Sequence, residues 1–325
     1  MKGIICYYSG SGNTKLACNY LKNKIKNADF ELYNIVKNDI PDFGEYDFVG
    51  FASFTDFGAP PKLMYMFFEK ISNQNGKNAF VFNTFGAISG KTIREFDKLV
   101  SEAGFKVHTG FSLHTPESYP PMRKRGMAYN NSPKEKNLNQ LDEFITDLDT
   151  IINEVKSSKE VEKRKLKLKL IGRLLPVYKR TQAKKDFGIQ NVKKELCAEC
   201  GVCMNGCPYE AITMNPKPIF NQGICAGCWY CYNHCKQKAI YTPKFSGDYQ
   251  YANPNENLKS KLYVNKDRNE KKGNNASRFL LDFKLGHKTV SADADPGKIK
   301  SQSIVDKEGS LSSRVGYRLE SSGIK

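Results

Sequence analysis

Eight of the ten cysteines in this 325-residue chain fall in two short runs of the same spacing. The runs are Cys197-x2-Cys200-x2-Cys203-x3-Cys207 and Cys225-x2-Cys228-x2-Cys231-x3-Cys235. Three thiolates spaced in this way can bind three irons of a cubane from one tight loop, and the fourth iron then takes a ligand from elsewhere. The spacing predicts two [4Fe–4S] clusters. Structural zinc is the alternative, although zinc sites use pairs of C-x2-C units and fit two four-cysteine runs poorly.

The two runs are related by a shift of 28 residues, which also maps Ala211-Ile212 onto Ala239-Ile240 and so marks an internal repeat. Residues 190–245 resemble bacterial two-cluster ferredoxins, apart from Lys236, where that family usually has proline. The resemblance implies that the fourth cysteine of each run ligates the cluster of the other run. One cluster then takes Cys197, Cys200, Cys203 and Cys235, and the other takes Cys225, Cys228, Cys231 and Cys207.

A second candidate site lies near the N-terminus, between a strand-like run and a helix-like run. It consists of Ser9, Gly10, Ser11, Gly12, Asn13 and Thr14. Glycines expose backbone N–H groups, hydroxyls donate hydrogen bonds and a helix N-terminus adds its dipole, so this loop suits a phosphate. The loop lacks the Gly-Lys-Ser/Thr of a Walker A motif, and Lys15 stands where a dinucleotide loop has its third glycine. It resembles the phosphate loop of flavodoxins, which implies FMN.

Two further loops match positions that flank the isoalloxazine ring in flavodoxins. By this resemblance the ring contacts come from Ser53, Phe54, Thr55, Thr84, Phe85 and Gly86, with Phe57 as a further candidate and Gly86 allowing a close backbone approach. Asp56 lies in the first loop, with no partner visible in the sequence. The alternative is that these phenylalanines only pack the core. The usual stacking tryptophan is missing, because the single Trp229 lies inside the second cysteine run.

Strand-like and helix-like runs alternate through the first 155 residues. The expected strands are Lys2–Tyr8, Phe30–Ile35, Phe48–Ser53, Asn78–Asn83 and Phe105–Phe111, and the expected helices are Thr14–Asn27, Pro61–Asn73, Lys91–Ala103 and Lys134–Val155. Such alternation predicts an α/β fold: a flavodoxin-like five-stranded parallel sheet with helices on both faces. The cysteine repeat adds a small α+β two-cluster ferredoxin-like domain. Cys6 and Cys18 fall inside expected elements and are expected to be small buried hydrophobes.

The sequence divides into four parts. These are a flavodoxin-like domain over residues 1–155, a basic and partly helical linker over 156–190, a ferredoxin-like domain over 191–250, and a polar, loosely packed or disordered tail over 251–325. The formal net charge of +17 is uneven, since residues 1–155 are neutral and residues 156–195 carry +10. Val161, Leu168, Ile171 and Leu175 could share one helix face, although residues 166–170 also alternate with period two.

The basic linker has three interpretations: a solvated connector, a docking face for an acidic redox partner protein, or, less favoured, a membrane-surface helix over residues 156–185. No nucleic-acid partner is expected, since no recognised module accompanies the charge. No apolar stretch approaches the ~18 residues of a spanning helix, and the N-terminus lacks the features of a signal peptide. A cytoplasmic location is expected, and the family resemblance implies an anaerobic one.

The combined motifs predict an electron-transfer protein that passes electrons between FMN and two [4Fe–4S] clusters, thereby linking two-electron and one-electron carriers. No catalytic triad or carboxylate pair is recognisable. Two alternatives stay open: a flavin-dependent oxidoreductase acting on a small molecule, and a ferredoxin attached to a flavin-free, flavodoxin-like docking domain.

Overall fold

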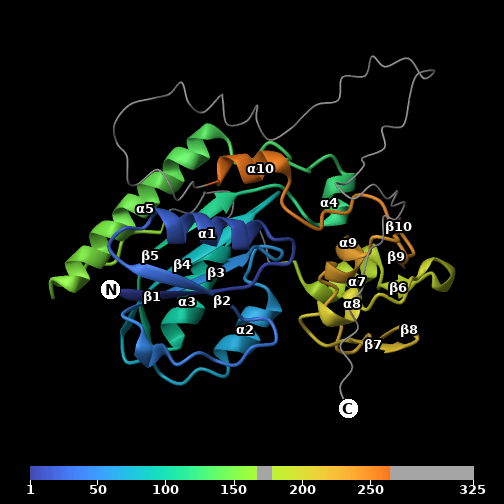
Figure 1. Ribbon diagram of the computed structural model, residues 1–325, viewed down its shortest axis with the longest axis horizontal. Coiled ribbons are helices and arrows are strands. Elements are labelled where there is room, and N and C mark those ends of the chain that lie inside the picture. The colour runs from blue at the N-terminus through green and yellow to red at the C-terminus, as the bar shows by residue number, and fades with distance from the viewer. Residues whose placement is uncertain (167–177, 264–325) are drawn as a thin grey trace, which may run out of the picture. The chain divides into compact units, whose positions relative to one another are not determined.

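Five parallel strands form the central sheet of the computed structural model, which describes residues 1–166 and 178–263 (Figure 1). The strands are β1 (Lys2–Tyr7), β2 (Asp29–Asn34), β3 (Phe48–Phe54), β4 (Lys77–Phe85) and β5 (Phe105–His114). Their order is β2-β1-β3-β4-β5, which is the flavodoxin-like doubly wound order. The five expected strands are confirmed to within a few residues. In this order a ligand binds beyond the carboxyl ends of β1, β3 and β4.

Helices cover both faces of the sheet, as the alternating pattern predicts (Figure 1). They are α1 (Asn13–Lys24) and α5 (Glu135–Lys156) on one face and α2 (Lys62–Phe68) and α3 (Thr92–Glu102) on the other. Successive residues of β1 alternate between these layers: Ile4 and Cys6 pack with α2 and α3, whereas Ile5 and Tyr7 pack with α1 and α5. Cys6 and Cys18 are fully buried, as expected.

Helix α2 is shorter than expected, ending at Phe68 rather than Asn73. The following residues form a polar turn in which Asn75 and Gly76 have positive φ values of 50° and 79°, a conformation that a right-handed helix cannot continue. The other three expected helices are confirmed to within a few residues.

The helix expected from Val161 onward is wrong for residues 159–166, which have no regular secondary structure. The backbone N–H of Arg164 donates to the carbonyl of His108 in β5 at 2.7 Å. Val161 is 4% exposed and packs in the core beside α5, and Lys163 pairs with Asp97 at 2.6 Å. Tertiary contacts along β5 therefore fix this segment in place of a helix. Leu168, Ile171 and Leu175 lie outside the described residues.

Shorter elements complete the chain. They are η1 (Phe43–Glu45), α4 (Pro120–Lys124), α7 (Arg180–Phe187), β6 (Asn191–Val192), η2 (Lys194–Leu196), α8 (Val202–Asn205), β7 (Ile212–Asn215), β8 (Lys217–Phe220), α9 (Tyr230–His234), β9 (Ile240–Thr242), β10 (Phe245–Ser246) and α10 (Glu256–Lys261). The small strands form a three-stranded sheet, β10-β9-β6, and the pair β7-β8. The cysteine-rich region is therefore a small α+β structure.

The internal repeat is visible in the backbone of the cysteine-rich region. Helices α8 and α9 each begin after a residue with left-handed backbone geometry, Gly201 at φ 70° and Trp229 at φ 67°. The same 28-residue shift relates Glu199 to Gly227 and Glu210 to Lys238, all of which have positive φ. Both cysteine runs therefore adopt one loop conformation, even where a side chain other than glycine makes it costly.

Packed structure continues beyond residue 250, so the expectation of a loosely packed tail is wrong for residues 251–262. Tyr251, Leu258 and Leu262 are 6%, 0% and 2% exposed, and both leucines join the hydrophobic cluster formed by α1 and α5. Helix α10 begins at Asn255, whose side chain accepts a hydrogen bond from Leu258 N. All described residues belong to one structural unit, residues 1–266.

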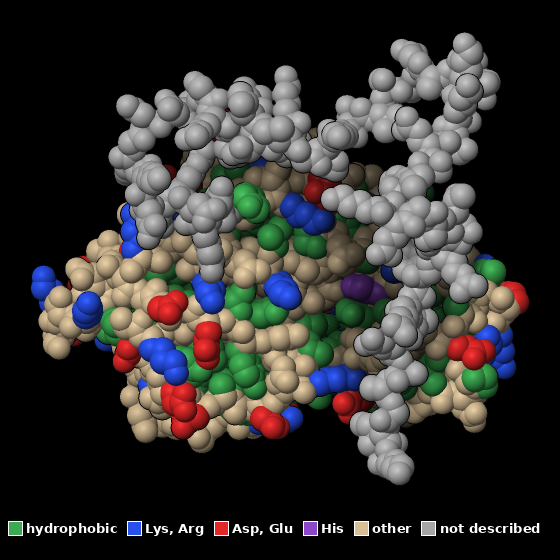
Figure 2. Space-filling view, viewed as in Figure 1, with side chains coloured by type: hydrophobic (Ala, Val, Ile, Leu, Met, Phe, Trp, Pro, Cys, Tyr) green, Lys and Arg blue, Asp and Glu red, His purple; other side chains and the backbone are tan. Residues whose placement is uncertain are grey.

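Charged side chains of both signs are interspersed on the face of the molecule shown in Figure 2, in keeping with the neutral balance of residues 1–155. Within the described ranges, no helix combines the length and the apolar character needed to cross a bilayer.

Candidate functional site

Backbone N–H groups point at three of the cysteine sulfurs. Cys207 accepts from Ala211 N at 3.4 Å and its repeat counterpart Cys235 accepts from Ala239 N at 3.3 Å. Cys225 also accepts from Gly227 N at 3.4 Å. Hydrogen bonds of this kind stabilise thiolate and tune iron–sulfur clusters. The donor set of soft sulfur ligands in cluster-type loops therefore fits the two clusters that the spacing predicts.

Two cysteines of the first run, Cys203 and Cys207, lie close enough to the second run to affect the pKa of its thiols. Burial raises the pKa of the Cys228 thiol to about 11, with Cys207 and Cys225 adding to the rise and the Arg180 guanidinium opposing it. Burial is also the main reason that the pKa of Cys231 is raised, and Cys207 again contributes. Across residues 1–166 and 178–263, no group of three or more His, Cys, Asp or Glu side chains is arranged around a single metal-ion position.

A cavity of about 790 Å³ lies at the carboxyl edge of the sheet, lined by the loops that follow β3, β4 and β5, by α7 and by one cysteine. Phe54, Thr55 and Gly86, three of the expected ring contacts, line it, and so does Cys228 of the second run. The cavity therefore reaches from the flavodoxin-like loops to an expected cluster ligand.

The other three expected ring contacts are not among the residues that line the cavity. Ser53 and Thr84 are buried at the ends of their strands, 0% and 1% exposed. Phe85 stacks on His114, with ring centroids 5.1 Å apart and planes 14° apart, so its ring serves packing.

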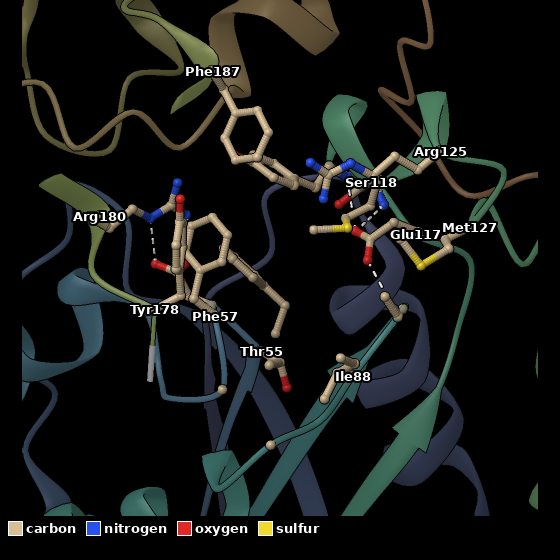
Figure 3. A pocket seen from close by; sticks show the side chains of 18 of the residues that line it. Thr55, Phe57, Ile88, Glu117, Ser118, Arg125, Met127, Tyr178, Arg180 and Phe187 are labelled. Atoms are coloured by element: carbon tan, nitrogen blue, oxygen red, sulfur yellow. Dashed lines mark hydrogen bonds and ion pairs between the residues drawn. The ribbon is translucent and has the colours of Figure 1, made fainter. Parts of the chain in front are cut away.

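Aromatic and charged side chains face each other across the cavity (Figure 3). Phe57 and Tyr178 lie on one side with their ring centroids 5.2 Å apart, and Glu117 and Met127 lie on the other. Tyr119 also lines the cavity, and its hydroxyl is buried without a hydrogen-bond partner. An apolar slot of this size fits a flat ring.

Arg180 of α7 joins two of the regions that line the cavity. Its Nε and Nη2 bind the Asp56 carboxylate at 2.8 and 2.5 Å, and its Nη1 donates to the carbonyl of Gly227 at 2.5 Å. Its guanidinium also lies 4.9 Å from the Phe57 ring centroid. Burial acts to lower the pKa of Arg180, but the Asp56 charge and hydrogen bond outweigh it and raise the pKa. The basic composition of the linker gave no sign of this role.

Glu117 organises the opposite side of the cavity. One carboxylate oxygen accepts from Ala87 N at 3.0 Å, and the other accepts from Ser118 N and Tyr119 N at 2.8 and 2.9 Å. A Cβ at Gly86 would lie 2.4 Å from the Glu117 carboxylate and 2.7 Å from its Cα. The close approach expected at Gly86 is therefore made by Glu117.

The expected phosphate loop is present, but none of residues 9–14 lines the cavity. Helix α1 begins after Gly12 at φ 84° with no side-chain cap and no acidic residue in its first turn, which leaves its N-terminus suited to an anion. The Asn13 amide donates to Pro116 O at 2.9 Å and accepts from the Tyr251 hydroxyl at 3.0 Å.

The remaining side chains of this loop also contact protein groups. Ser9 Oγ accepts from Lys15 N at 3.2 Å, and the hydroxyls of Thr14 and Thr84 lie 2.9 Å apart. Pro254 packs on Gly12, where a Cβ would lie 2.8 Å from its Cδ. Tyr251 and Pro254 thus cover the loop at Gly12 and Asn13, which lies outside the lining of the cavity.

Among the known proteins similar to this chain, the following three each match less than half of it. No family model matches it. The uncharacterized protein MJ0298 of Methanocaldococcus jannaschii is 33% identical over 150 residues, which cover 44% of this chain and 95% of that protein. An archaeal flavodoxin is 22% identical, and the match covers 47% of this chain and 99% of that flavodoxin, with a TM-score of 0.37. The flavodoxin of Streptococcus pneumoniae TIGR4 is 20% identical, and the match covers 46% of this chain and 99% of that flavodoxin, with a TM-score of 0.36.

Proposed function

This chain belongs to the same family as the Methanocaldococcus jannaschii protein, and we propose that it transfers electrons between an FMN-type flavin and two [4Fe–4S] clusters. One observation carries the proposal: Phe54 and Thr55 of a flavodoxin-like ring loop line the same cavity as Cys228 of a cluster-type loop. A flavin ring in this cavity would lie beside a ligand of the second cluster, with no intervening domain.

The side chains of this protein would hold the flavin ring and exclude water from it. Phe57 and Tyr178 supply apolar surface on one side, and Glu117 fixes the backbone of Ala87 and Tyr119 on the other. A flavin supplies a store of two electrons that can be released one at a time, which suits one-electron clusters. The N-terminus of α1, with its phosphate loop at residues 9–14, would bind the phosphate.

Anaerobically purified full-length protein provides the direct test. Chemical analysis is expected to give about eight iron atoms, about eight acid-labile sulfides and about one released flavin per chain. Rapid reduction should then show absorbance changes of flavin and clusters that equilibrate with each other. Zinc in place of iron, or clusters that are reduced while bound flavin never responds, would contradict the proposal. Iron without flavin, even after FMN is added, would leave the docking-domain alternative.

A second function is favoured by the size of the cavity. Its volume of about 790 Å³ falls in the upper part of the range of about 300–1,000 Å³ for small-molecule sites. Arg125 and Lys244 add positive charge to its lining. A flavin-dependent oxidoreductase acting on a small molecule therefore fits as well. Turnover of quinones, nitro compounds or NAD(P)H above the rate of free FMN would support it.

The charge distribution supports one proposal about partners. Because residues 156–195 carry +10 while residues 1–155 are neutral, an acidic redox protein would dock most favourably at the linker. Binding to such a protein should weaken steeply as salt is added. Binding that persists at full strength when only the linker charge is reduced would count against this site.

A further inference from the structure

Arg180 of α7 contacts both a loop of the cavity and the second cysteine run, whereas Lys184 of the same helix lies beside Gly227 and donates to Gln222 O at 3.1 Å. The Nε and Nη2 edge of its guanidinium binds the Asp56 carboxylate in the loop after β3, while Nη1 binds the carbonyl of Gly227. Gly227 stands between Cys225 and Cys228 in the second cysteine run. One side chain from the linker therefore ties a loop of the cavity to a loop that would hold a cluster.

The ion pair is well shielded from solvent, with 22% of the Arg180 side chain and 9% of the Asp56 side chain exposed. A two-point contact of an arginine with a carboxylate is geometrically specific, and shielding strengthens its electrostatic effect. Asp56 lies at the edge of the guanidinium opposite to Gly227, so the positive charge is nearer to the cysteine run than the negative charge. The pair thus presents an oriented dipole, with its positive end toward Gly227 of the second cysteine run.

We propose that Arg180 is a positioning residue that both fixes the loop at residues 55–58 against the second cysteine run and raises the reduction potential of the cluster bound there. The inference rests on the proposed function in assuming that a cluster occupies this run. Reduction adds one negative charge to a cluster, and a nearby cation stabilises that charge. Net charge and hydrogen bonding around a cluster are known to set its potential.

The effect should be confined to one cluster. Arg180 contacts Gly227 in the second run, whereas the repeat counterpart of Gly227 in the first run is Glu199, whose side chain pairs with Lys217 at 2.6 Å and is 45% exposed. Lys217, which is 27% exposed, also donates to the carbonyl of Cys197 at 2.8 Å, so the first run has a cation of its own that substitution of Arg180 leaves in place. The cluster that takes three ligands from the first run is therefore an internal reference in the same sample.

The test is a potentiometric titration of full-length protein, with each cluster followed by its electron paramagnetic resonance signal. In Arg180→Gln the cluster of the second run should become harder to reduce, with the ratio of reduced to oxidised cluster falling about tenfold at a fixed potential, or about 59 mV for one electron. Asp56→Asn should shift the same cluster in the opposite direction, because it leaves the cation without its counter-ion. Arg180→Lys should restore the potential in large part.

Lys185→Gln is the matched control, because it removes the same charge from an exposed position of the same helix, where solvent screens it. Unchanged potentials in Arg180→Gln, or equal shifts in the control, would overturn the inference. Shifts of the same sign in Arg180→Gln and Asp56→Asn would also overturn it, since they would report loss of loop packing. Wild-type protein without clusters would instead refute the proposed function, which separates the two failures.

Discussion

At the scale of residues, the structure shows which of the eight clustered cysteines lines the cavity. Cys228 lines it, and Cys207 of the first run adds to the rise that burial causes in the pKa of Cys228. The two runs share a loop conformation that repeats after 28 residues. A ligand at the cavity would give the cluster of the second run the shortest route to a flavin.

Replacement of Cys228 should remove one cluster and leave the other. Cys228→Ala is expected to lower iron from about eight to about four per chain and to uncouple flavin reduction from the remaining cluster. Cys18→Ala is the matched control, since Cys18 is buried in α1 and faces no cysteine run. Retention of all iron in Cys228→Ala would refute the ligand assignment.

Glu117 should control the shape of the cavity without contacting a cluster. Glu117→Gln exchanges one carboxylate oxygen for an amide that cannot accept from backbone N–H, so at least one of three hydrogen bonds is lost. The loss should destabilise the protein by about 1–3 kcal/mol and weaken flavin binding. Fluorescence titration with FMN measures the second effect, and iron content should stay at the wild-type value. Wild-type affinity in a folded variant would show that this loop does not contact the flavin.

The sequence was a good guide to residues that act through local spacing and a poor one to residues that act through distant pairing. The cysteine runs, Phe54, Thr55 and Gly86 could be identified because each motif is short. Arg180 and Asp56 are 124 positions apart, and only the fold brings them together. Glu117 was missed for a similar reason, since its partner Ala87 lies in the loop of another strand.

At the scale of elements, alternation of apolar residues was sufficient to predict the five strands, because the buried strands of a parallel sheet are short apolar runs. It could not predict the irregularity in β5. Val107 pairs with Ala79 and Thr109 pairs with Phe80, so His108 is an extra residue that bulges from the ladder. The bulge directs the His108 carbonyl to Arg164 and thereby draws residues 159–166 along the sheet edge.

His108, the residue at this bulge, is expected to make the stability of the folded protein depend on pH. His108 is 1% exposed and hydrogen-bonds Asn78 at 2.8 Å, and burial, followed by the charges of Lys106 and Lys163, lowers its pKa to about 4. Between pH 6.5 and 4 the unfolded chain binds a proton that the folded chain does not, so stability present above pH 6.5 is lost as the pH falls. The loss should total about 3 kcal/mol.

Denaturant unfolding at several pH values, compared between wild type and His108→Gln, isolates this contribution, because the variant keeps an amide donor for Asn78 but cannot titrate. The difference in free energy of unfolding between the two proteins should narrow as the pH falls from about 7 to about 4.5. A difference that is constant over this range would show that His108 titrates alike in the folded and unfolded chains.

At the scale of the whole molecule, residues 251–262 connect parts of the chain that look separate in the sequence. Tyr251 contacts Asn13 of the phosphate loop across 238 positions, and Gln250 donates to the carbonyls of Tyr232 and Cys235 at 2.6 and 3.0 Å. Composition suggested a loose tail because this stretch is rich in Asn and Lys, whereas two leucines one helical turn apart are enough to anchor it.

Truncation at two positions should isolate the contribution of residues 251–262. A chain ending at Tyr263 keeps the contacts described for this segment and is expected to match the full-length protein in melting temperature and flavin affinity. A chain ending at Gln250 loses Leu258 and Leu262, each worth about 2–5 kcal/mol when removed from a core, and also uncovers Gly12 and Asn13.

The shorter chain should therefore melt at a lower temperature and bind FMN more weakly. Tyr251→Phe in the full-length chain removes only the hydrogen bond to Asn13 and separates the two effects. It should weaken FMN binding through the phosphate loop while leaving Leu258, Leu262 and the melting temperature nearly unchanged. If truncation at Gln250 leaves both quantities as in the longer chain, residues 251–262 have no part in the flavin site, and the loop at residues 9–14 binds its phosphate unaided.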